Sequence, residues 1–340
     1  MSQKPLLIVE SPTKIKTIQK YLGNDYEVIS CVGHVKDLLT KELGIDIDKD
    51  FEIKLTILPD KKKFITELRK KSKSADRVLI ATDPDREGEA IAAHLASEVP
   101  EEKLERVQFT EITKAGIVEG MNNVREIDQN LVDAQIARRV IDRLVGYKVS
   151  PVLWATLQSN MKFVTTTLSA GRVQSAAVKI IVDRDRLRVK FLRSTYFDLK
   201  ATLNKDGDSN VFHATLIRVD GARIASSNDF DPETGALKNK DVLLLTESQA
   251  DALVKELDSS DWTVTKIVEK PRTSNPKPPF TTSTLQQEAA RKLRNSARQT
   301  MRTAQQLYEN GFITYMRTDS TNLSEEAIAG ARQVIQDLYG

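Results

Sequence analysis

The stretch RVLIATDPDREGEAIAAHLASEVP, residues 77–100, decides the fold. It opens with a short apolar run that ends in an acid at Asp83, and apolar residues at helical spacing follow. The stretch PLLIVESPTKIKTIQKYLG, residues 5–23, repeats this order, with a Ser-Pro helix start and a glycine stop. Because helices alternate with these strands, we expect the strands to run parallel.

A third strand and helix continue the pattern. ERVQF, residues 105–109, has the composition of a strand, and TEITKAGIVEGM, residues 110–121, has that of a helix. We therefore predict a multidomain α/β protein. Its first domain, residues 1–145, is expected to be Rossmann-like, with a doubly wound and mostly parallel sheet.

The rest of the chain has different residue patterns. Residues 129–157 and 169–193 have the pattern of helices, joined by a polar, threonine-rich loop. From Tyr196, short alternating runs separated by NKDGDS and VDG predict an antiparallel sheet with Asp-Gly turns. DWTVTKIVEK, residues 261–270, predicts a further strand ahead of a proline-rich linker.

Helical patterning returns at residues 282–310, and the chain is expected to end within or just after a helix at Gly340. No internal repeat or coiled coil interrupts this order. We predict four domains: an α/β domain at 1–145, a helical segment at 146–195, an antiparallel β segment at 196–270 and a second helical segment at 271–340.

The composition is that of an ordinary soluble protein. The chain has 340 residues, 40% hydrophobic and 29% charged, so more than one domain is expected. The single cysteine, Cys31, excludes a disulfide framework and a cysteine-rich zinc site within these residues. The first apolar run is too short for a signal peptide or a membrane span. We expect a cytoplasmic protein with no membrane partner.

The distribution of charge is more informative than the net charge of +3. Residues 289–304 hold five basic side chains and no acidic one, and residues 179–193 hold six against two. Each block alone is typical of a solvated helix face. Two such blocks in one chain favour a polyanion as the partner.

Acids follow two of the predicted strands. Glu10 ends the first strand, Asp83 and Asp85 follow the second, and Glu87 and Glu89 come next. In an open α/β sheet, ligands bind outside the carboxyl ends of the strands, and carboxylates gathered there repel one another unless a cation lies among them. The acids therefore predict a Mg²⁺ site. Acids that suit a helix dipole would explain Glu87 and Glu89, but not an acid from a second strand.

Two further observations concern phosphate. Lys14, one helical turn past Glu10, adds a cation near this edge. The chain has no GxxxxGK[ST] phosphate loop, so nothing indicates that ATP is hydrolysed.

GFITYMRTDS, residues 311–320, places Tyr315 two residues before Arg317. Taken alone, this pair is typical of a half-buried strand residue and a surface charge.

The motifs VESPTKIKTI, DPDREGEAIAAHL, FTEIT, DRLVGYKVSPVLW, LSAGRVQS and ENGFITYMRTDSTNLS span residues 9–324. Their sequence and order resemble bacterial type IA DNA topoisomerases, and topoisomerase I more than topoisomerase III. The first two motifs also resemble the Toprim metal-binding fold, which primases and some nucleases share. The resemblance therefore implies a Toprim domain at residues 1–145 and an active-site tyrosine domain at residues 271–340.

The resemblance implies that Tyr315 attacks a DNA phosphodiester and leaves a 5′-phosphotyrosine and a free 3′-hydroxyl. A tyrosine of pKa about 10 is scarcely ionised at neutral pH, a deficit that a neighbouring cation can reduce. If the segment is extended, Arg317 shares a strand face with Tyr315 and can bind the scissile phosphate. By the same match, Glu10 acts as general acid and Lys14 supports phosphate binding. The implied Mg²⁺ ligands are Asp83, Asp85, Glu87 and Glu10.

A possible base-recognition stripe lies in ARRVIDRLVGY, residues 137–147. Arg139, Arg143 and Tyr147 recur every four residues and would share one helix face, which by itself is typical of a solvated surface. Such groups also stack on unpaired bases. The resemblance implies a pocket for a cytosine four nucleotides upstream of the cleaved bond. The other implied DNA contacts are Arg138, Asp142, Arg172, Gln174, His34, Thr314 and Asp319.

The resemblance thus implies a Mg²⁺-dependent enzyme that cleaves, passes and rejoins single-stranded DNA without ATP and relaxes negative supercoils. We expect a monomer acting at the bacterial nucleoid. Family members continue past the tyrosine motif, so the tyrosine domain is expected to be incomplete, and the loop between Trp154 and Leu168 is longer than is usual. The alternatives are a Toprim nuclease or primase, which would have no use for Tyr315, and a truncated single-stranded DNA binding module.

Overall fold

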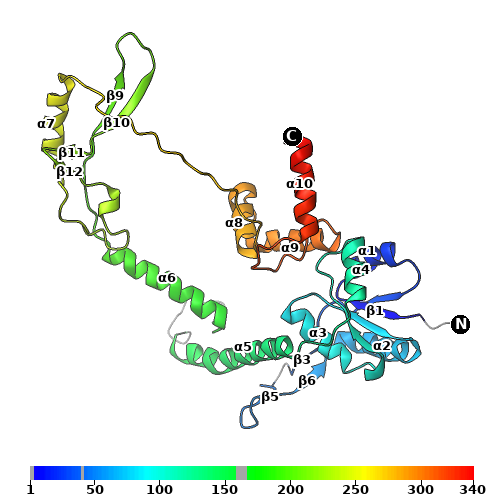
Figure 1. Ribbon diagram of the computed structural model, residues 1–340. Helices are drawn as coiled ribbons and strands as arrows, with labels where there is room; N and C mark the ends of the chain where they lie inside the picture. The colour runs from blue at the N-terminus through cyan, green and yellow to red at the C-terminus, as the bar shows by residue number, and fades with distance from the viewer. Residues whose placement is uncertain (1–3, 40–41, 158–166) are drawn as a thin grey trace. The chain divides into compact units, whose positions relative to one another are not determined.

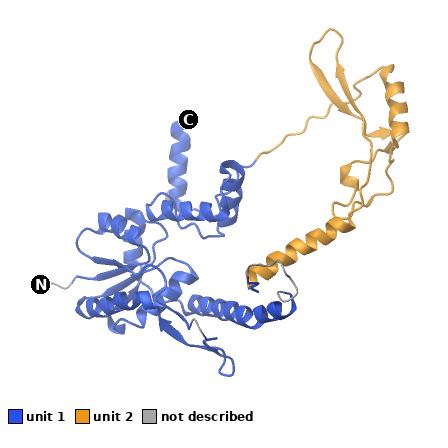
Figure 2. Ribbon diagram, turned by 180° about the vertical axis from the view of Figure 1, so that it is seen from behind, with its two compact units in different colours: residues 1–171, 275–340 blue, residues 172–274 orange. Residues whose placement is uncertain are grey.

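The computed structural model describes residues 4–39, 42–157 and 167–340. The chain divides into two compact units, shown in Figure 2: residues 1–171 together with 275–340, and residues 172–274. The loop that was expected to be long, around residues 158–166, lies outside the described residues.

The first unit is built on a four-stranded parallel sheet (Figure 1). In spatial order its strands are β2 (Glu27–Ser30), β1 (Leu6–Val9), β7 (Val78–Ala81) and β8 (Leu104–Arg106). Each neighbouring pair is parallel. The predicted mostly parallel α/β fold is therefore confirmed.

Helices cover both faces of this sheet because β1 and β7 are buried on both sides. Residues such as Leu7 and Leu79 face one cluster, whereas Ile8 and Ile80 face the other. The first cluster takes side chains from α1 (Pro12–Leu22), α4 (Lys114–Asn122) and α9 (Ala297–Glu309), and the second from α2 (Lys62–Ser74) and α3 (Arg86–Ala96). Helix α9, which is far from the sheet strands in sequence, thus contributes to the core on one face of the sheet.

A long helix, α5 (Gln129–Thr156), starts at the cap Asp128, whose side chain accepts from the amides of Asn130 and Leu131. It packs against α3, and its Val140 forms a small buried cluster with Leu38 and Ile45. Short antiparallel pairs supply this cluster: β3 (Lys36–Leu38) with β6 (Leu55–Ile57), and β4 (Ile45–Asp46) with β5 (Glu52–Ile53).

The predicted helix at 282–310 is two helices, α8 (Thr282–Leu293) and α9. They are separated at Arg294, which has the left-handed φ of 59°, and α9 is capped by Ser296. After α9 the chain forms no helix or strand until α10 (Glu325–Tyr339). The segment at Tyr315 is therefore not a strand, because it joins the sheet face through one amide bond, from Tyr315 N to Thr110 O, rather than through a ladder.

Gly311 explains how the chain turns after α9. Its φ is +78°, and a Cβ there would lie 2.5 Å from the carbonyl oxygen of Ile112. Only glycine accommodates both the backbone conformation and the close approach. The turn directs the following residues back to the carboxyl edge of the sheet.

The second unit begins with α6 (Arg172–Lys190). Strands β9 (Lys200–Asn204) and β10 (Val211–Thr215) pair antiparallel, as do β11 (Arg218–Val219) and β12 (Ala222–Arg223), and α7 (Glu247–Asp258) follows. The predicted antiparallel sheet is confirmed. Among the described residues, short 3-10 helices lie at Pro59–Lys61, Glu101–Lys103 and Ser227–Asp229.

The strand predicted at residues 261–270 is absent from the structure. Its apolar residues are exposed, Ile267 at 80%, and no neighbouring strand among the described residues supplies hydrogen bonds to it. An alternating pattern needs such a partner to become a strand. None of the helices in the described ranges has the length and apolar character needed to cross a membrane.

Candidate active site

The acids predicted from the sequence meet at one edge of the parallel sheet. Glu10 follows β1, and Asp83 and Asp85 follow the neighbouring β7. Asp85 caps α3 by accepting a bond of 2.8 Å from the amide of Gly88. A Cβ on Gly88 would lie 2.2 Å from the Asp83 carbonyl oxygen, so glycine allows α3 to begin directly against this turn.

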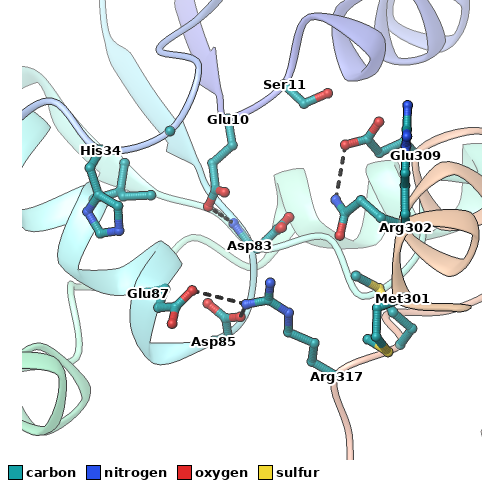
Figure 3. A pocket seen from close by; sticks show the side chains of 14 residues that line it. Glu10, Ser11, His34, Asp83, Asp85, Glu87, Met301, Arg302, Glu309 and Arg317 are labelled. Carbon is teal, nitrogen blue, oxygen red and sulfur yellow. Dashed lines mark hydrogen bonds and ion pairs between the residues drawn. The ribbon is translucent and has the colours of Figure 1, made fainter. Parts of the chain in front are cut away.

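These acids line a cavity of about 470 Å³ that also includes Glu87 and Arg317 (Figure 3). The cavity draws residues from both ends of the first unit, since Met301, Arg302 and Glu309 line it as well. The sheet edge and the tyrosine segment therefore line the same cavity.

Tyr315 lies beside the acids and is held as a neutral phenol. Its hydroxyl donates to Asp85 Oδ2 at 2.5 Å, and its side chain is buried. Burial raises the pKa of Tyr315 well above its usual value, and the hydrogen bond to Asp85 raises it further. Arg317 acts in the opposite direction but does not offset these effects. The neighbouring cation thus lowers the pKa of Tyr315, as expected, but the pKa stays raised overall in the protein without DNA.

Arg317 bridges two acids. Its Nη1 donates to Asp85 Oδ2 at 3.0 Å and to Glu87 Oε2 at 3.1 Å. The oxygen of Asp85 that accepts from Tyr315 thus also accepts from Arg317. Although the segment is not a strand, both side chains reach the same carboxylate, so the predicted convergence of Tyr315 and Arg317 is present.

Lys14 and Tyr308 are buried next to Asp83 and Tyr315. Lys14 is buried and forms an ion pair with Asp83, and its Nζ lies 5.0 Å from the centre of the Tyr308 ring. The Tyr308 hydroxyl donates to the carbonyl oxygen of Phe109 at 2.7 Å. Its ring packs edge-on against Tyr315, with centroids 5.1 Å apart. Sequence analysis missed Tyr308, because its position on a helix indicates only core packing.

Glu10 is the acid best placed to exchange a proton. It accepts from the amide of Asp83 at 2.8 Å. Burial raises the pKa of Glu10 to about 7, and the charge of Asp83 contributes in the same direction. A carboxyl with such a pKa can hold and release a proton near neutral pH.

Glu89 has a structural place that the sequence did not reveal. It is fully buried, and its Oε2 accepts from Arg106 at 2.9 Å and from Arg125 at 2.8 Å. Arg106 also donates to the carbonyl oxygens of Thr82 and Asp83, which form the turn after β7. This network fixes the turn that carries the acids. In the sequence, Arg106 lies within a short strand and has no distinguishing signal.

The candidate Mg²⁺ ligands are paired with the protein's own donors. Within the part of the chain that the structure describes, no group of three or more His, Cys, Asp or Glu side chains is arranged to hold a metal ion. Asp85 and Glu87 nevertheless each place an oxygen within 3.1 Å of one atom, Arg317 Nη1. Two carboxylates that face one point fit Mg²⁺, which commonly uses one or two carboxylates and keeps several waters.

The predicted base-recognition stripe lies on α5. Arg139 forms a two-point pair with Asp37, at 3.0 and 2.5 Å. Arg143 donates to the Tyr147 hydroxyl at 3.0 Å and lies over its ring, 5.0 Å from the centre. Arg143 also donates to the carbonyl oxygen of Leu39 at 2.8 Å. The three residues are therefore on one side of α5, as their spacing predicted.

The other predicted DNA contacts fall into two groups. Arg138, Asp142 and His34 line a polar cavity of about 390 Å³ beside Arg139 and Glu87. Thr314 and Asp319 are exposed on the segment that carries Tyr315. Arg172 and Gln174 are exposed on α6, which belongs to the second unit. Their contacts with DNA stay predictions.

The parallel sheet with acids at its carboxyl edge defines a class of metal-binding domain. The family model of the Toprim domain matches residues 5–112, which include β1, β7 and all of these acids. A second family model, described as DNA topoisomerase, matches residues 126–340. The chain belongs to the bacterial type IA DNA topoisomerases.

Relatives agree with this assignment. The chain is 48% identical to DNA topoisomerase 1 of Synechocystis, over 98% of this chain and 38% of that protein. It is 46% identical to DNA topoisomerase 1 of Mycobacterium tuberculosis H37Rv, over 100% of this chain and 38% of the relative. The structure of full-length topoisomerase I from Thermotoga maritima matches with a TM-score of 0.75 and 40% identity, over 98% of this chain and 53% of that one. The chain thus spans about two fifths of the length of these curated relatives.

Proposed function

We propose that this chain supplies the cleavage centre of a Mg²⁺-dependent type IA topoisomerase. Its substrate is single-stranded or negatively supercoiled DNA, which it cleaves, passes and rejoins without ATP, as a monomer in the cytoplasm beside the bacterial nucleoid. The observation that carries the proposal is the bond of 2.5 Å between the Tyr315 hydroxyl and Asp85 at the acidic edge of the Toprim sheet. A nucleophile and an acceptor for its proton within hydrogen-bond reach are the geometry that covalent catalysis needs.

Cleavage exchanges one phosphodiester for another. The Tyr315 oxygen attacks the DNA phosphorus and forms the new P–O bond, while its proton passes to Asp85, which already accepts it in a hydrogen bond. The bond from phosphorus to the 3′-oxygen breaks, and that oxygen takes a proton from Glu10, whose pKa of about 7 leaves it partly protonated at neutral pH. Religation is the reverse, so no energy source is needed.

The cations stabilise the phosphate during this exchange. Arg317 is half exposed and already within the cavity, so its guanidinium can turn to the phosphate oxygens and bind them at two points. Lys14 stays anchored to Asp83 and holds positive charge beneath the site. Asp85 and Glu87, with Asp83 and Glu10 beside them, would hold Mg²⁺. The ion, when bound, supplies charge that orients and neutralises phosphate oxygens.

A covalent trapping experiment tests this proposal. Single-stranded DNA labelled at its 3′ end is incubated with the protein, and the reaction is stopped with denaturant. We expect labelled DNA to remain attached to the wild-type protein and to Tyr339→Phe, an exposed control on α10, but not to Tyr315→Phe. Free DNA ends without attachment would instead support a Toprim nuclease, and binding without cleavage would support a module that only holds DNA.

A further inference from the structure

The Asp85 and Glu87 carboxylates have a cation between them in the protein without DNA. Arg317 Nη1 lies 3.0 Å from Asp85 Oδ2 and 3.1 Å from Glu87 Oε2. The nearest other cation to this pair is Arg138, whose Nη1 lies 3.9 Å from the second oxygen of Glu87. The guanidinium therefore compensates the charge of both acids at the point on which they converge.

The neighbouring acids are engaged separately. Asp83 pairs with the buried Lys14, and Glu10 accepts from the amide of Asp83. Within the described part of the chain, Asp85 and Glu87 are thus the two carboxylates of the cavity that share Arg317. Arg317 can move away from its acids more easily than Lys14 can, because the Arg317 side chain is 50% exposed and the Lys14 side chain is 2% exposed.

We propose that Arg317 and a divalent cation exclude each other between Asp85 and Glu87, and that a DNA phosphate opens this place for the metal by drawing Arg317 away. The inference rests on the proposed function, because it takes the metal to bind these acids and the phosphate to bind Arg317. It adds an order of events: metal binds weakly to the free protein and more tightly once a DNA phosphate is present.

The physical reason is the competition of like charges for the same oxygens. A guanidinium and a divalent cation cannot both lie about 3 Å from Asp85 Oδ2 without strong repulsion in a partly buried site. A phosphate offers the guanidinium an equivalent two-point partner, so Arg317 can leave the acids without losing its charged hydrogen bonds. Linkage then requires that metal and phosphate each strengthen the binding of the other.

The exchange also concerns Tyr315. Asp85 Oδ2 accepts from both the phenol and Arg317, so this oxygen already carries a cation and the phenol bond together. A metal ion in the place of Arg317 would share the oxygen with the phenol in the same way, and Asp85 would stay the acceptor for the Tyr315 proton. One carboxylate oxygen thus contacts both key side chains of the tyrosine segment.

Mn²⁺ binding to the DNA-free protein, measured by titration calorimetry, tests the exchange without any catalytic readout. Arg317→Gln is compared with Arg302→Gln, a matched loss of one positive charge in the same cavity, where Arg302 has no ion pair with Asp85 or Glu87 among the described residues. We expect Arg317→Gln to bind Mn²⁺ at least about fivefold more tightly than both the wild type and Arg302→Gln, the lower end of typical coupling between two binding events. Both substituted side chains are exposed, so the variants are expected to fold.

A second titration adds oligothymidylate to both proteins. The oligonucleotide should tighten Mn²⁺ binding to the wild type by at least about fivefold and have a much smaller effect in Arg317→Gln. Equal affinities of wild type and Arg317→Gln for Mn²⁺ would overturn the exchange while leaving the metal site intact. Mn²⁺ could also fail to bind, or bind in a way that Asp85→Asn does not weaken, with or without oligothymidylate. Either result would overturn the metal assignment and the exchange with it. Covalent trapping by Tyr315 would still test the cleavage chemistry independently.

Discussion

The ring of Tyr308 packs edge-on against the ring of Tyr315, with centroids 5.1 Å apart and planes at 70°. Tyr308 lies on α9 and is 1% exposed, so it connects the core of the sheet face with the proposed nucleophile. The same ring faces the Lys14 ammonium. One buried side chain therefore positions two groups of the site.

Substitution of Tyr308 should separate stability from positioning. Tyr308→Phe leaves the Phe109 carbonyl oxygen without its donor, and we expect a loss of about 1–3 kcal/mol in the free energy of unfolding. Covalent trapping should persist, because the ring still supports Tyr315. Tyr308→Leu removes the ring and should reduce the rate of trapping further than Tyr308→Phe at equal occupancy by DNA. Urea unfolding and single-turnover trapping measure the two effects. Equal trapping rates in the two variants would exclude a positioning role for the ring.

Asp83 should be needed for folding as well as for any metal. Asp83→Asn leaves the buried Lys14 ammonium without its partner, so we expect a destabilisation of roughly 3–5 kcal/mol, seen as a lower urea midpoint. Adding Lys14→Met to Asp83→Asn removes the uncompensated charge and should restore much of that loss. If the double variant is no more stable than Asp83→Asn alone, the buried pair is not what stabilises this edge.

Glu10 should make stability depend on pH in the absence of metal. Its pKa is raised by burial to about 7 from the usual value of 4.5, so the folded state binds the proton more tightly than the unfolded state does. Its contribution is therefore fully present below pH 4.5 and is lost as pH rises through about 7. We expect the wild type to lose on the order of 2 kcal/mol relative to Glu10→Gln across this window. Urea unfolding in EDTA at several pH values measures the difference, and parallel curves for the two proteins would refute it.

The α5 stripe should select a base. If Arg143 and Tyr147 stack on an unpaired cytosine, Arg143→Ala or Tyr147→Ala should weaken the preference for cytosine four nucleotides upstream of the cleaved bond by roughly 1–3 kcal/mol. Mapping the cleavage sites on a random single strand measures this preference. Wild-type sites with no cytosine enrichment, or variants with an unchanged distribution, would show that the Arg143–Tyr147 pair serves only the helix surface.

Local signals explain which parts of the fold could be predicted. The apolar runs at β1 and β7, the Ser11 cap and the Gly23 stop are encoded within a few residues, so the alternating strands and helices followed directly. The acids at the carboxyl edge followed from that topology. The finer division at residues 145, 195 and 270 stays a prediction.

Features that depend on distant contacts were not accessible. The Tyr315 amide bonds to the Thr110 carbonyl oxygen, far away in sequence, so the path of this segment could not be predicted from local pattern. Arg106 acts through a buried network that no local pattern marks. The pKa of Tyr315 is raised overall because its burial and its hydrogen bond to Asp85, which depend on distant residues, outweigh the charge of Arg317. The motifs identify the side chains of the site, but they do not show which of these side chains form hydrogen bonds or ion pairs with one another.

The proposed function requires that Tyr315 forms a covalent bond to the 5′-phosphate at a DNA break. The most direct measurement uses one single strand labelled at either its 3′ or its 5′ end, with denaturation after the reaction and peptide mapping of the trapped protein. The account predicts that the 3′-labelled fragment stays attached, through a phosphate on the peptide containing Tyr315, while the 5′-labelled fragment is released with a free 3′-hydroxyl. Attachment of the 5′-labelled fragment, or a trapped peptide that does not contain Tyr315, would contradict it.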